Sequence, residues 1–414
     1  MAMKESGIEW VGLIPDTWSV IPNKYVMHKE KNLCEKWSGE DVMSLTMNGV
    51  IVRDLQNPTG KMPATFDGYQ YIEDGDLLMC LFDIDITPRC VGRVTHDGVT
   101  SPAYSNFKVH DNASRDYFYY YYLMVDNTKE LLHLAKNLRH SFTEEQLGQL
   151  KVPMPLLSEQ QTIADYLDEE CSKIDDIIAE ANASIEEYKE LKQAVIDNAT
   201  MTGIHDSEMK YTDYTWFPEM PQNWDLVLAS LLFREDVRPV DADDVSLSLS
   251  QVDGLIPTDD MSERSLKSAT HDNWKHVIPD DLVLNRFKGH LGVFFASKYT
   301  GMVSFHYGVY HAIRDDVYAK YYEYLFHSTT YKNIFALKSN GITVGLQNLS
   351  NGNFYSVKIL HPTLDEQIEI VKYLDKRTAE INSLIAEKEF LIKDLESYKK
   401  SLIYEVVTGK RRVV

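Results

Sequence analysis

The chain has 414 residues, of which 44% are hydrophobic and 25% are charged, and its formal net charge is −21 at pH 7. This length predicts two or three domains with sizeable cores. The negative net charge is not the basic charge that is typical of a nucleic-acid-binding domain. No apolar run approaches the roughly 18 residues of a membrane span, and the amino terminus lacks an apolar signal core, so we expect a soluble, cytoplasmic protein without a membrane partner.

A short phrase near the amino terminus places a proline between two tryptophans. Residues 10–18 read W-V-G-L-I-P-D-T-W, and residues 216–224 read W-F-P-E-M-P-Q-N-W, 206 positions further on. Both phrases have W-x4-P-x2-W spacing. Because a proline packed between two indoles makes a compact lead-in to a domain, we interpret both phrases as structural clasps.

The segment after the first clasp, residues 23–150, is predicted to be a mixed α/β domain. Strand-like apolar runs occur at 76–82, 91–94 and 106–109, and a tyrosine-rich stretch at 117–124 is typical of a helix. Asp-Gly turn signals separate several of these runs.

Residues 225–360 repeat the same order of elements. The run at 281–287 corresponds to the first strand of the earlier domain, and the run at 321–326 corresponds to its tyrosine helix. Away from these landmarks the two segments differ markedly. The predicted architecture is therefore a clasp, a globule and a long helix, present twice.

Each globule leads into a long helical segment. The first is predicted to begin near Ser158, because Ser158 and Gln161 have capping-box spacing, and about forty residues follow without a proline or glycine. Apolar residues recur there in alternating steps of three and four, which is typical of a coiled-coil seam on a helix roughly 65 Å long at about 1.5 Å per residue. Residues 362–409 repeat the pattern with an offset of 207, and both copies end in Thr-Gly. A helix this long needs a partner helix, and the second copy is that partner.

The predicted fold class is α+β, with two globular mixed α/β domains joined by two long helices in a pseudo-twofold internal repeat. The predicted boundaries are 1–154 for the first domain with its clasp, 155–203 for the first long helix, 204–360 for the second domain with its clasp, and 361–414 for the second long helix.

The sequence contains no credible catalytic constellation. It has no P-loop, no G-x-S-x-G and no H-E-x-x-H motif, and its four cysteines include no C-x-x-C pair. The string at 57–60, N-P-T-G, reads as a turn and not as the base pocket of a methyltransferase. Pro279-Asp280 is not followed by the acid-x-Lys pair of a Mg-dependent nuclease. We therefore expect a non-catalytic chain that holds no metal and no cofactor of its own.

Polar side chains that suit DNA occur at matching places in both globules. Arg, Lys, Asn and Gln make bidentate contacts with base edges, and Ser and Tyr hydroxyls contact phosphates. Each such residue is more often a solvated surface residue when taken singly, but the recurrence favours a shared role. The DNA-binding candidates are Arg89, Arg93, Tyr104, Asn106, Lys108, Arg139, Ser141, Arg286, Lys288, His290, Ser304, His306, Tyr307, Lys338, Asn340 and Gln347.

The charge distribution separates the globules from the helices. Residues 155–203 contain twelve acidic residues and three lysines, whereas each globule contains thirteen lysines or arginines. Phosphates should avoid the acidic helix, which is either a solvated coiled-coil flank or a face for another protein. Any DNA is therefore expected to bind the globules, with the helices holding them apart.

The doubled phrases at the helix starts carry a resemblance to a known family. Residues 157–168 read L-S-E-Q-Q-T-I-A-D-Y-L-D, and residues 364–375 read L-D-E-Q-I-E-I-V-K-Y-L-D. Together with the W-x4-P-x2-W clasps and the closing Thr-Gly, they resemble the specificity subunits of type I restriction–modification systems over the whole chain. The T-A-E-L repeat of that family is approximated once, at 378–381.

The resemblance implies a division of labour. Two target-recognition domains would each read one half of a bipartite site on double-stranded DNA. The long helices would form an antiparallel coiled coil that serves as a spacer and as a docking surface for two methyltransferase (modification) subunits. Restriction/translocase subunits would join through the complex, in defence against foreign DNA. S-adenosylmethionine, ATP and Mg are then expected on those partner subunits.

Two alternatives stay open from the sequence. The chain could serve a fused restriction–methyltransferase instead of separate subunits. It could also be a coiled-coil scaffold whose globules bind proteins and not DNA, which the net charge of −21 would suit. A steep dependence of binding on salt would separate DNA reading from the scaffold.

Overall fold

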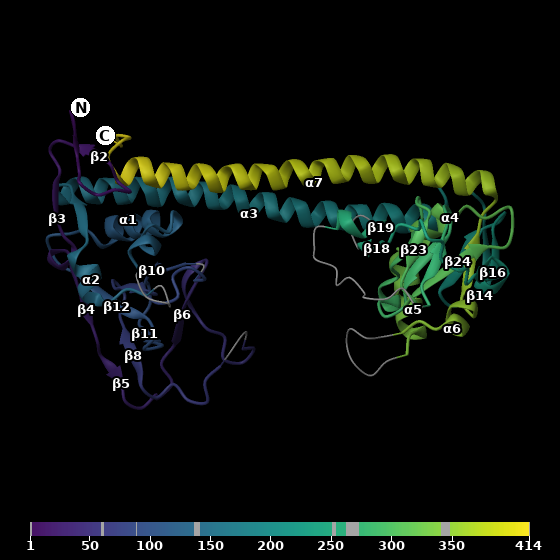
Figure 1. The fold of residues 1–414 in the computed structure, drawn as a ribbon, viewed down its shortest axis with the longest axis horizontal. Helices are drawn as coiled ribbons and strands as arrows, with labels where there is room; N and C mark the ends of the chain where they lie inside the picture. Colours follow the sequence, from purple (N-terminus) through teal and green to yellow (C-terminus); the bar gives the residue numbers. More distant parts are fainter. Residues whose placement is uncertain are drawn as a thin grey trace. The chain divides into compact units, whose positions relative to one another are not determined.

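The chain forms two compact units. Unit 1 comprises Met1–Ala181 and Phe390–Val414, and unit 2 comprises Asn182–Glu389. Each unit contains one globular domain and a part of both long helices, α3 (Leu157–Thr202) and α7 (Leu364–Val407) (Figure 1). The computed structural model describes residues 2–58, 62–87, 89–135, 141–250, 254–261, 273–340 and 348–413.

Short strands build the globular domain of unit 1. The strands are β1 (Met3–Glu5), β2 (Leu13–Pro15), β3 (Ser19–Pro22), β4 (Met27–Glu30), β5 (Leu33–Cys34), β6 (Val42–Thr46), β7 (Gly49–Val52), β8 (Tyr69–Ile72), β9 (Leu77–Met79), β10 (Val91–Arg93), β11 (Gly98–Thr100), β12 (Ser105–Val109) and β13 (Lys151–Met154). The helices are α1 (Arg115–Asn127), α2 (Glu144–Gln149), η1 (Asn23–Tyr25) and η2 (Glu130–Leu134).

Unit 2 contains a comparable set of elements. Its strands are β14 (Met209–Tyr214), β15 (Phe217–Pro221), β16 (Asp225–Leu228), β17 (Phe233–Glu235), β18 (Leu247–Ser250), β19 (Gly254–Pro257), β20 (Lys275–Val277), β21 (Leu282–Asn285), β22 (Phe294–Ala296), β23 (Gly301–Val303), β24 (Tyr307–Ala312) and β25 (Lys358–His361). Its helices are α4 (Ala319–Phe326), α5 (Thr329–Lys338), α6 (Asn351–Tyr355), η3 (Ala229–Leu231), η4 (Thr258–Asp260) and η5 (Gly289–Leu291).

A four-stranded antiparallel sheet recurs in both units. Its strand order is β10-β9-β12-β4 in unit 1 and β22-β21-β24-β17 in unit 2, so each strand has a counterpart. The remaining strands differ, since unit 1 adds a five-stranded sheet, β5-β8-β11-β6-β7, where unit 2 has the two pairs β18-β19 and β20-β23. The predicted α+β repeat with divergent globules is thus confirmed.

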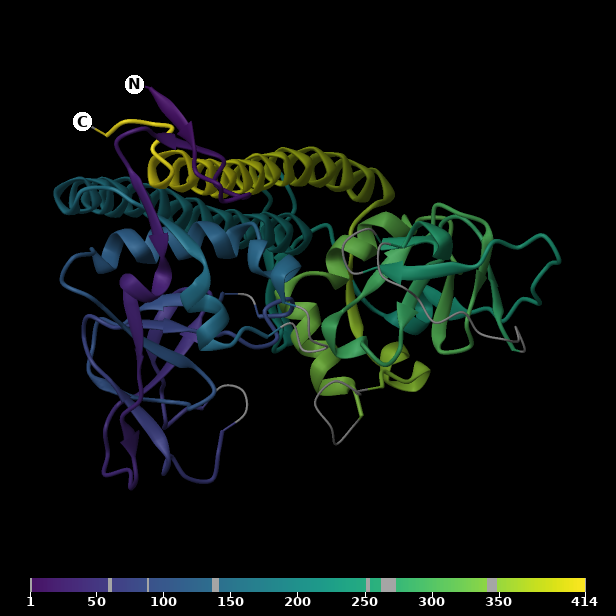
Figure 2. The ribbon, with the colours of Figure 1, turned by 60° about the vertical axis from the view of Figure 1, so that its left-hand side comes forward.

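A tyrosine-rich helix joins the sheet of each unit to a long helix. In unit 1 this helix is α1, which lies alongside α3 (Figures 1 and 2). The Tyr120 hydroxyl of α1 donates to Asp168 of α3 at 2.7 Å, and in unit 2 the Tyr324 hydroxyl of α4 donates to Asp375 of α7 at 2.7 Å. The aspartate of each repeated Tyr-Leu-Asp phrase therefore holds a globule to a long helix.

A buried glutamine lies in the first turn of each long helix. Gln160 and Gln367 are both fully buried. The Oε1 atom of Gln160 accepts the backbone N–H of Ser114, the N-cap of α1, at 2.8 Å, and that of Gln367 accepts the N–H of Tyr318, the N-cap of α4, also at 2.8 Å. Both glutamines also donate to the carbonyl of the proline five residues earlier. The repeated Glu-Gln thus links the start of each long helix to the start of a tyrosine helix.

The helix start predicted near Ser158 is confirmed to within one residue, because α3 begins at Leu157, but Ser158 lies inside the helix and does not cap it. The Ser158 carbonyl accepts the Thr162 hydroxyl one turn later, as a residue within a helix does. Capping-box spacing is frequent near helix starts, and here the neighbouring glutamine takes the structural role instead.

The clasps pack against the closing glycines of the long helices. Gly409 has φ +72°, and a Cβ there would lie 2.5 Å from Pro15 Cδ and 2.9 Å from Trp18 Cη2. Gly203 has φ +80°, and a Cβ there would lie in van der Waals contact with Trp224, 3.5 Å from its Cζ2 atom. A helix commonly ends with glycine in this left-handed conformation. The Trp-Pro-Trp and Thr-Gly phrases are distant in the sequence but are in contact in the structure.

The two long helices pack together through an apolar seam, in antiparallel directions. In unit 1 the first part of α3, including Leu167 and Ile174, shares a core with Leu402 and Val406 near the end of α7. In unit 2 the last part of α3 shares a core with the first turns of α7. The predicted coiled coil is confirmed.

No helix in the described part of the chain is long and apolar enough to cross a membrane.

We predict that Gly409→Ala destabilises unit 1 by at least about 1–2 kcal/mol, because alanine is strained at positive φ and its Cβ would collide with Pro15. Gly352→Ala is the matched control, since nothing lies within 4 Å of a Cβ there. Denaturant unfolding of both variants checks this expectation. Equal free energies of unfolding would contradict the role given to the clasp.

Candidate nucleic-acid interface

Equivalent ends of the two four-stranded sheets, which we call their edges, hold six of the predicted polar residues. Ser105 at the start of β12 faces Met79 at the end of β9, and Tyr307 at the start of β24 faces Asn285 at the end of β21. Loops that follow β9 or β21 and residues that precede β12 or β24 therefore emerge at one edge. This edge is the same in both units, so their surfaces can be compared directly.

In unit 2 this edge carries exposed aromatic and cationic side chains, which we call the unit 2 edge patch: Phe287, Lys288, Phe305 and His306. The Phe287 and Phe305 side chains are 40% and 52% exposed. The His306 ring lies 3.8 Å from the Phe305 centroid and 5.0 Å from that of Phe287. Lys288 is exposed and makes no ion pair within the described residues. The patch thus offers stacking surfaces beside a free cation.

The other predicted residues near this edge are partly covered. Ser304 and Tyr307 are half-buried, and the Tyr307 carbonyl accepts a hydrogen bond from Lys275. His290 lies in η5, outside the residues whose side chains the structure describes.

In unit 1 the corresponding edge forms a hollow of about 340 Å³, which we call the unit 1 edge hollow. The predicted residues Arg89 and Tyr104 line it, and both are half-buried. Burial raises the pKa of the Tyr104 hydroxyl, which therefore stays a neutral donor and acceptor. Exposed apolar side chains, among them Met47 and Ile86, lie around these polar groups.

Three predicted residues of unit 1 are already bonded to acidic side chains. Arg93 forms a bidentate pair with Asp168, with nitrogen–oxygen distances of 2.8 and 3.0 Å. Asn106 is 1% exposed and donates to Asp76 at 2.6 Å, and Lys108 pairs with Glu73 at 2.7 Å. We leave Arg93 and Asn106 out of the candidate interface, because their polar atoms serve the fold.

Arg286 is also engaged inside the protein. It donates to Glu235 at 2.6 Å and to the Asn351 side-chain oxygen at 2.7 Å, and Lys275 donates to the same carboxylate at 2.7 Å. Burial opposes ionisation of Glu235, but the hydrogen bonds from Lys275 and Asn351 and the nearby cations outweigh it and hold the pKa of that carboxyl below its usual value. Arg286 therefore neutralises a half-buried carboxylate that ties β17 to α6.

The remaining candidates lie on other surfaces. Lys338 ends α5 and donates to the Ser356 hydroxyl at 3.1 Å, and Asn340 is exposed, with its backbone bridged to Asn348. Ser141 is half-buried before α2. Arg139 and Gln347 lie outside the described residues.

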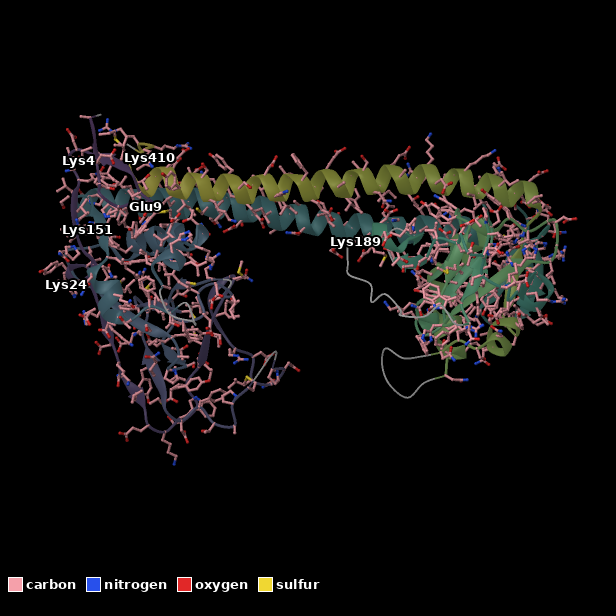
Figure 3. All side chains as sticks on the ribbon, viewed as in Figure 1. Lys4, Glu9, Lys24, Lys151, Lys189 and Lys410 are labelled. Atoms are coloured by element: carbon pink, nitrogen blue, oxygen red, sulfur yellow. The ribbon has the colours of Figure 1, made fainter. Side chains whose placement is uncertain are left out.

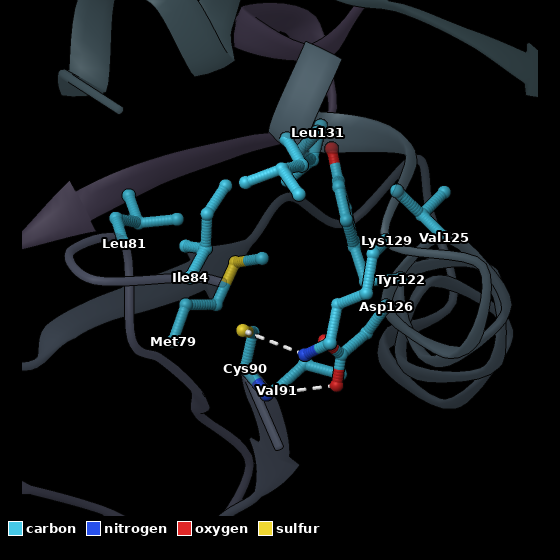
Figure 4. A pocket seen from close by; sticks show the side chains of 11 residues that line it. Met79, Leu81, Ile84, Cys90, Val91, Tyr122, Val125, Asp126, Lys129 and Leu131 are labelled. Atoms are coloured by element: carbon cyan, nitrogen blue, oxygen red, sulfur yellow. Dashed lines mark hydrogen bonds and ion pairs between the residues drawn. The ribbon is translucent and has the colours of Figure 1, made fainter. Parts of the chain in front are cut away.

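A second pocket of unit 1 lies between the sheet and α1 and is lined mainly by apolar side chains (Figure 4). Its polar members hold the neighbouring loop in place: Asp126 accepts the N–H of Cys90 at 2.8 Å, and Lys129 donates to the Thr87 carbonyl at 2.8 Å. Burial raises the pKa of the Cys90 thiol, so the thiol stays protonated. This pocket supports the loop that carries Arg89.

Among the described residues, one group has a composition that could suit a metal ion: Asp241, Asp244 and His276. His276 Nδ1 and Asp244 Oδ2 are 2.7 Å apart and hydrogen-bond to each other, and the Asp241 N–H also donates to Asp244. These bonds account for the proximity of the three residues.

The sequence did not identify the exposed apolar members of both edges, such as Phe82, Ile86, Phe287 and Phe305, as surface residues. Phe82 and Phe287 lie within the runs predicted as strands at 76–82 and 281–287, but these strands end at Met79 and Asn285. No sequence feature separates these exposed residues from the buried residues of the same runs, because both are apolar.

The comparisons with known proteins define the class of this chain. Residues 90–187 and 258–393, together more than half of the chain, match the family described as the type I restriction modification DNA specificity domain. The chain belongs to this family.

Solved structures show the same fold at low sequence identity. One matching chain comes from work on the structural basis underlying complex assembly and conformational transition of the type I R-M system; it is 12% identical, with a TM-score of 0.69 over 96% of this chain and 99% of that chain. The HsdS subunit from Thermoanaerobacter tengcongensis is 13% identical, with a TM-score of 0.52 over 96% of this chain and 98% of that chain.

We predict that Arg286→Ala destabilises unit 2 by about 1–3 kcal/mol at neutral pH, because it leaves a buried carboxylate short of a donor. The pKa of Glu235 is lowered in the folded state, so its stabilising effect is present above the unfolded pKa and is lost as the pH falls through the folded pKa. The difference from the wild type should therefore shrink in acid.

Denaturant unfolding at neutral and acidic pH measures this difference. Lys288→Ala is the control, since an exposed lysine without an ion pair should change stability by less than about 0.5 kcal/mol. Unchanged stability in Arg286→Ala, with an altered methylated base, would show that Arg286 reads DNA after all.

Proposed function

We propose that this chain is the DNA-recognition subunit of a type I restriction–modification complex and that each unit reads one half of a bipartite site. The observation that carries the proposal is the repeated four-stranded sheet, whose equivalent edges bear different side chains. A shared scaffold with divergent edges is what two readers of different half-sites require. Membership of the DNA specificity family favours this function over a protein-binding scaffold.

The chemistry of the unit 2 edge patch supports DNA contact. Phe287, Phe305 and His306 offer rings for apolar contact with base edges, including thymine methyl groups, and Lys288 can neutralise a phosphate. Lys338 and Asn340 are proposed as further contacts of unit 2, and Lys108 and Ser141 as further contacts of unit 1. A small interface in each unit gives modest specificity, and joining two of them raises affinity through effective concentration.

We propose that methyl transfer and cleavage belong to partner subunits: two methyltransferase subunits, and restriction/translocase subunits that join through the complex. S-adenosylmethionine, ATP and Mg would bind on those partners. The related structure described in terms of complex assembly of the type I R-M system supports partners of this kind. This chain would then contribute recognition and no catalytic group.

The long helices are proposed to act as the spacer and as the docking surface for the methyltransferase subunits. Both helices pass through both units, and their exposed side chains include Ile177, Leu191, Leu384 and Phe390, between 40% and 65% exposed. These side chains would offer apolar surface that a docked methyltransferase subunit could bury.

We predict that exchanging residues 225–360 for the second domain of another family member changes one half of the methylated site and leaves the other half intact. The reason is that the exchanged segment contains the sheet and the edge patch of unit 2 but none of unit 1. Mapping methylated adenines in cells that express the chain with its methyltransferase partners measures the outcome. Changes in both halves would contradict separate readers.

We also predict that seven matched residues inserted into both long helices, near Ile178 and Ile385, widen the gap between the half-sites by about three base pairs. A heptad keeps the apolar seam nearly in phase and adds about 10 Å at 1.5 Å per residue, and DNA rises about 3.4 Å per base pair. The bases read in each half should not change.

The same methylation mapping measures that gap, although the added rotation can weaken binding. A four-residue insertion is the control, because it moves the seam out of phase. An unchanged gap in an active, folded heptad variant would show that the helices do not set the spacing.

A further inference from the structure

The unit 1 edge hollow contains an arginine without an acceptor. Arg89 is half-buried, yet its guanidinium makes no hydrogen bond or ion pair with any described residue. The nearby arginines on β10 and α1 do form ion pairs: Arg93 pairs with Asp168, and Arg115 pairs with Asp116. A half-buried guanidinium has lost part of its water and gains from an acceptor supplied by a ligand.

The hollow also contains an acceptor and a hydroxyl that are free. The Asp83 carboxylate and the Tyr104 hydroxyl line it and have no side-chain partner among the described residues. Asp83 has φ 46°, a left-handed conformation that few non-glycine residues adopt, and its carbonyl accepts the N–H groups of Ile86 and Thr87. The loop therefore holds an aspartate in a strained conformation among the residues that line the hollow.

Hydrogen bonds to Cys80, Asp126 and Lys129 fix the backbone of the loop that carries Arg89. Cys80 N–H donates to the Cys90 carbonyl at 2.9 Å, and Cys90 N–H donates to Asp126 at 2.8 Å. Lys129 then donates to Asp126 and to the Thr87 carbonyl, both at 2.8 Å. These contacts restrict the backbone at Thr87 and Cys90, on either side of Arg89, so less ordering of this loop is needed when a ligand binds.

The charges of the hollow select a base edge over a phosphate. Of its lining side chains only Asp83 and Arg89 are charged, and they have opposite signs, so the hollow offers a phosphate no net attraction. A guanidinium fork matches O6 and N7 of guanine, and a carboxylate accepts the N4 amine of cytosine. Exposed Met47, Phe82 and Ile86, which are 56%, 37% and 74% exposed, supply apolar contact around these polar groups.

We infer that Arg89 determines a base of the half-site read by unit 1, and that the unit 1 edge hollow receives the major-groove edge of a G·C pair. Arg89 contacts guanine, and Asp83 accepts a hydrogen bond from the paired cytosine. This inference deepens the proposed function and rests on it. It adds the chemical identity of one base pair and assigns it to unit 1.

The test compares methylation directed by the wild-type chain, Arg89→Ala and Arg89→Lys, each expressed with its methyltransferase partners. Arg89→Ala should remove the requirement for guanine at one position of one half-site and weaken binding to the cognate site roughly tenfold to a hundredfold. Arg89→Lys keeps the charge but loses the planar fork, so the guanine requirement should weaken there as well. The other half-site should not change.

Lys24→Ala is the matched control. Lys24 precedes β4, whose first residue, Met27, pairs with Val109 at the far end of β12 from Tyr104 (Figure 3). Its removal should leave the methylated sequence unchanged. Thermal unfolding of each variant shows whether it is folded, and Arg89→Lys decides the question if Arg89→Ala does not fold.

Three outcomes would overturn the inference while the proposed function stands: guanine still required in folded Arg89→Ala, a change at a base pair other than G·C, or affinity lost equally for cognate and unrelated DNA. The last result would mark a phosphate contact, which Arg89→Lys would largely preserve. Failure of the wild-type chain to direct any methylation would instead remove the proposed function itself.

Discussion

The structure depends on how the ends of the long helices are buried in the globules. An isolated helix of this length exposes its apolar seam, and its terminal N–H and C=O groups lack partners. Here a buried glutamine links each helix start to the N-cap of a tyrosine helix, and a left-handed glycine at each helix end packs on an indole. Tyrosine hydroxyls satisfy carbonyls in the last turns, from Tyr117 to Val407 and from Tyr321 to Thr200. These contacts explain why phrases so far apart in the chain are repeated together.

The same anchoring separates the part of each globule that must stay constant from the part that can vary. The tyrosine helix and one face of the four-stranded sheet are committed to a long helix, so their residues are constrained by packing. Among the described residues, the edges that carry the unit 2 edge patch and the unit 1 edge hollow do not contact a long helix in this way. One carries aromatic rings and a lysine, and the other carries a free arginine. A constant scaffold with variable edges can present different chemistry to DNA without a change of fold.

Several polar side chains that look suited to DNA are used inside the protein. Arg93 joins α1, β10 and α3 through Asp116 and Asp168, and Arg286 neutralises Glu235 beside Lys275. A buried or half-buried carboxylate without its cation would be costly, so these arginines are held by the fold. The arginine that remains free, Arg89, differs from them in its surroundings and not in its type.

The sequence by itself determined the repeat, the long helices and the tyrosine helices, because each depends on local periodicity or on a repeated phrase. It also placed strands at 76–82, 91–94, 106–109 and 281–287, and the structure has strands there at 77–79, 91–93, 105–109 and 282–285. It could not assign partners to polar side chains: Arg89 and Arg93 lie four residues apart, one facing a hollow and the other an aspartate 75 positions away. It also could not show that Phe287 and Phe305 are exposed, since apolar residues beside strands usually enter the core. Only the tertiary structure decided these points, because hydrogen bonding and burial depend on which distant segments meet.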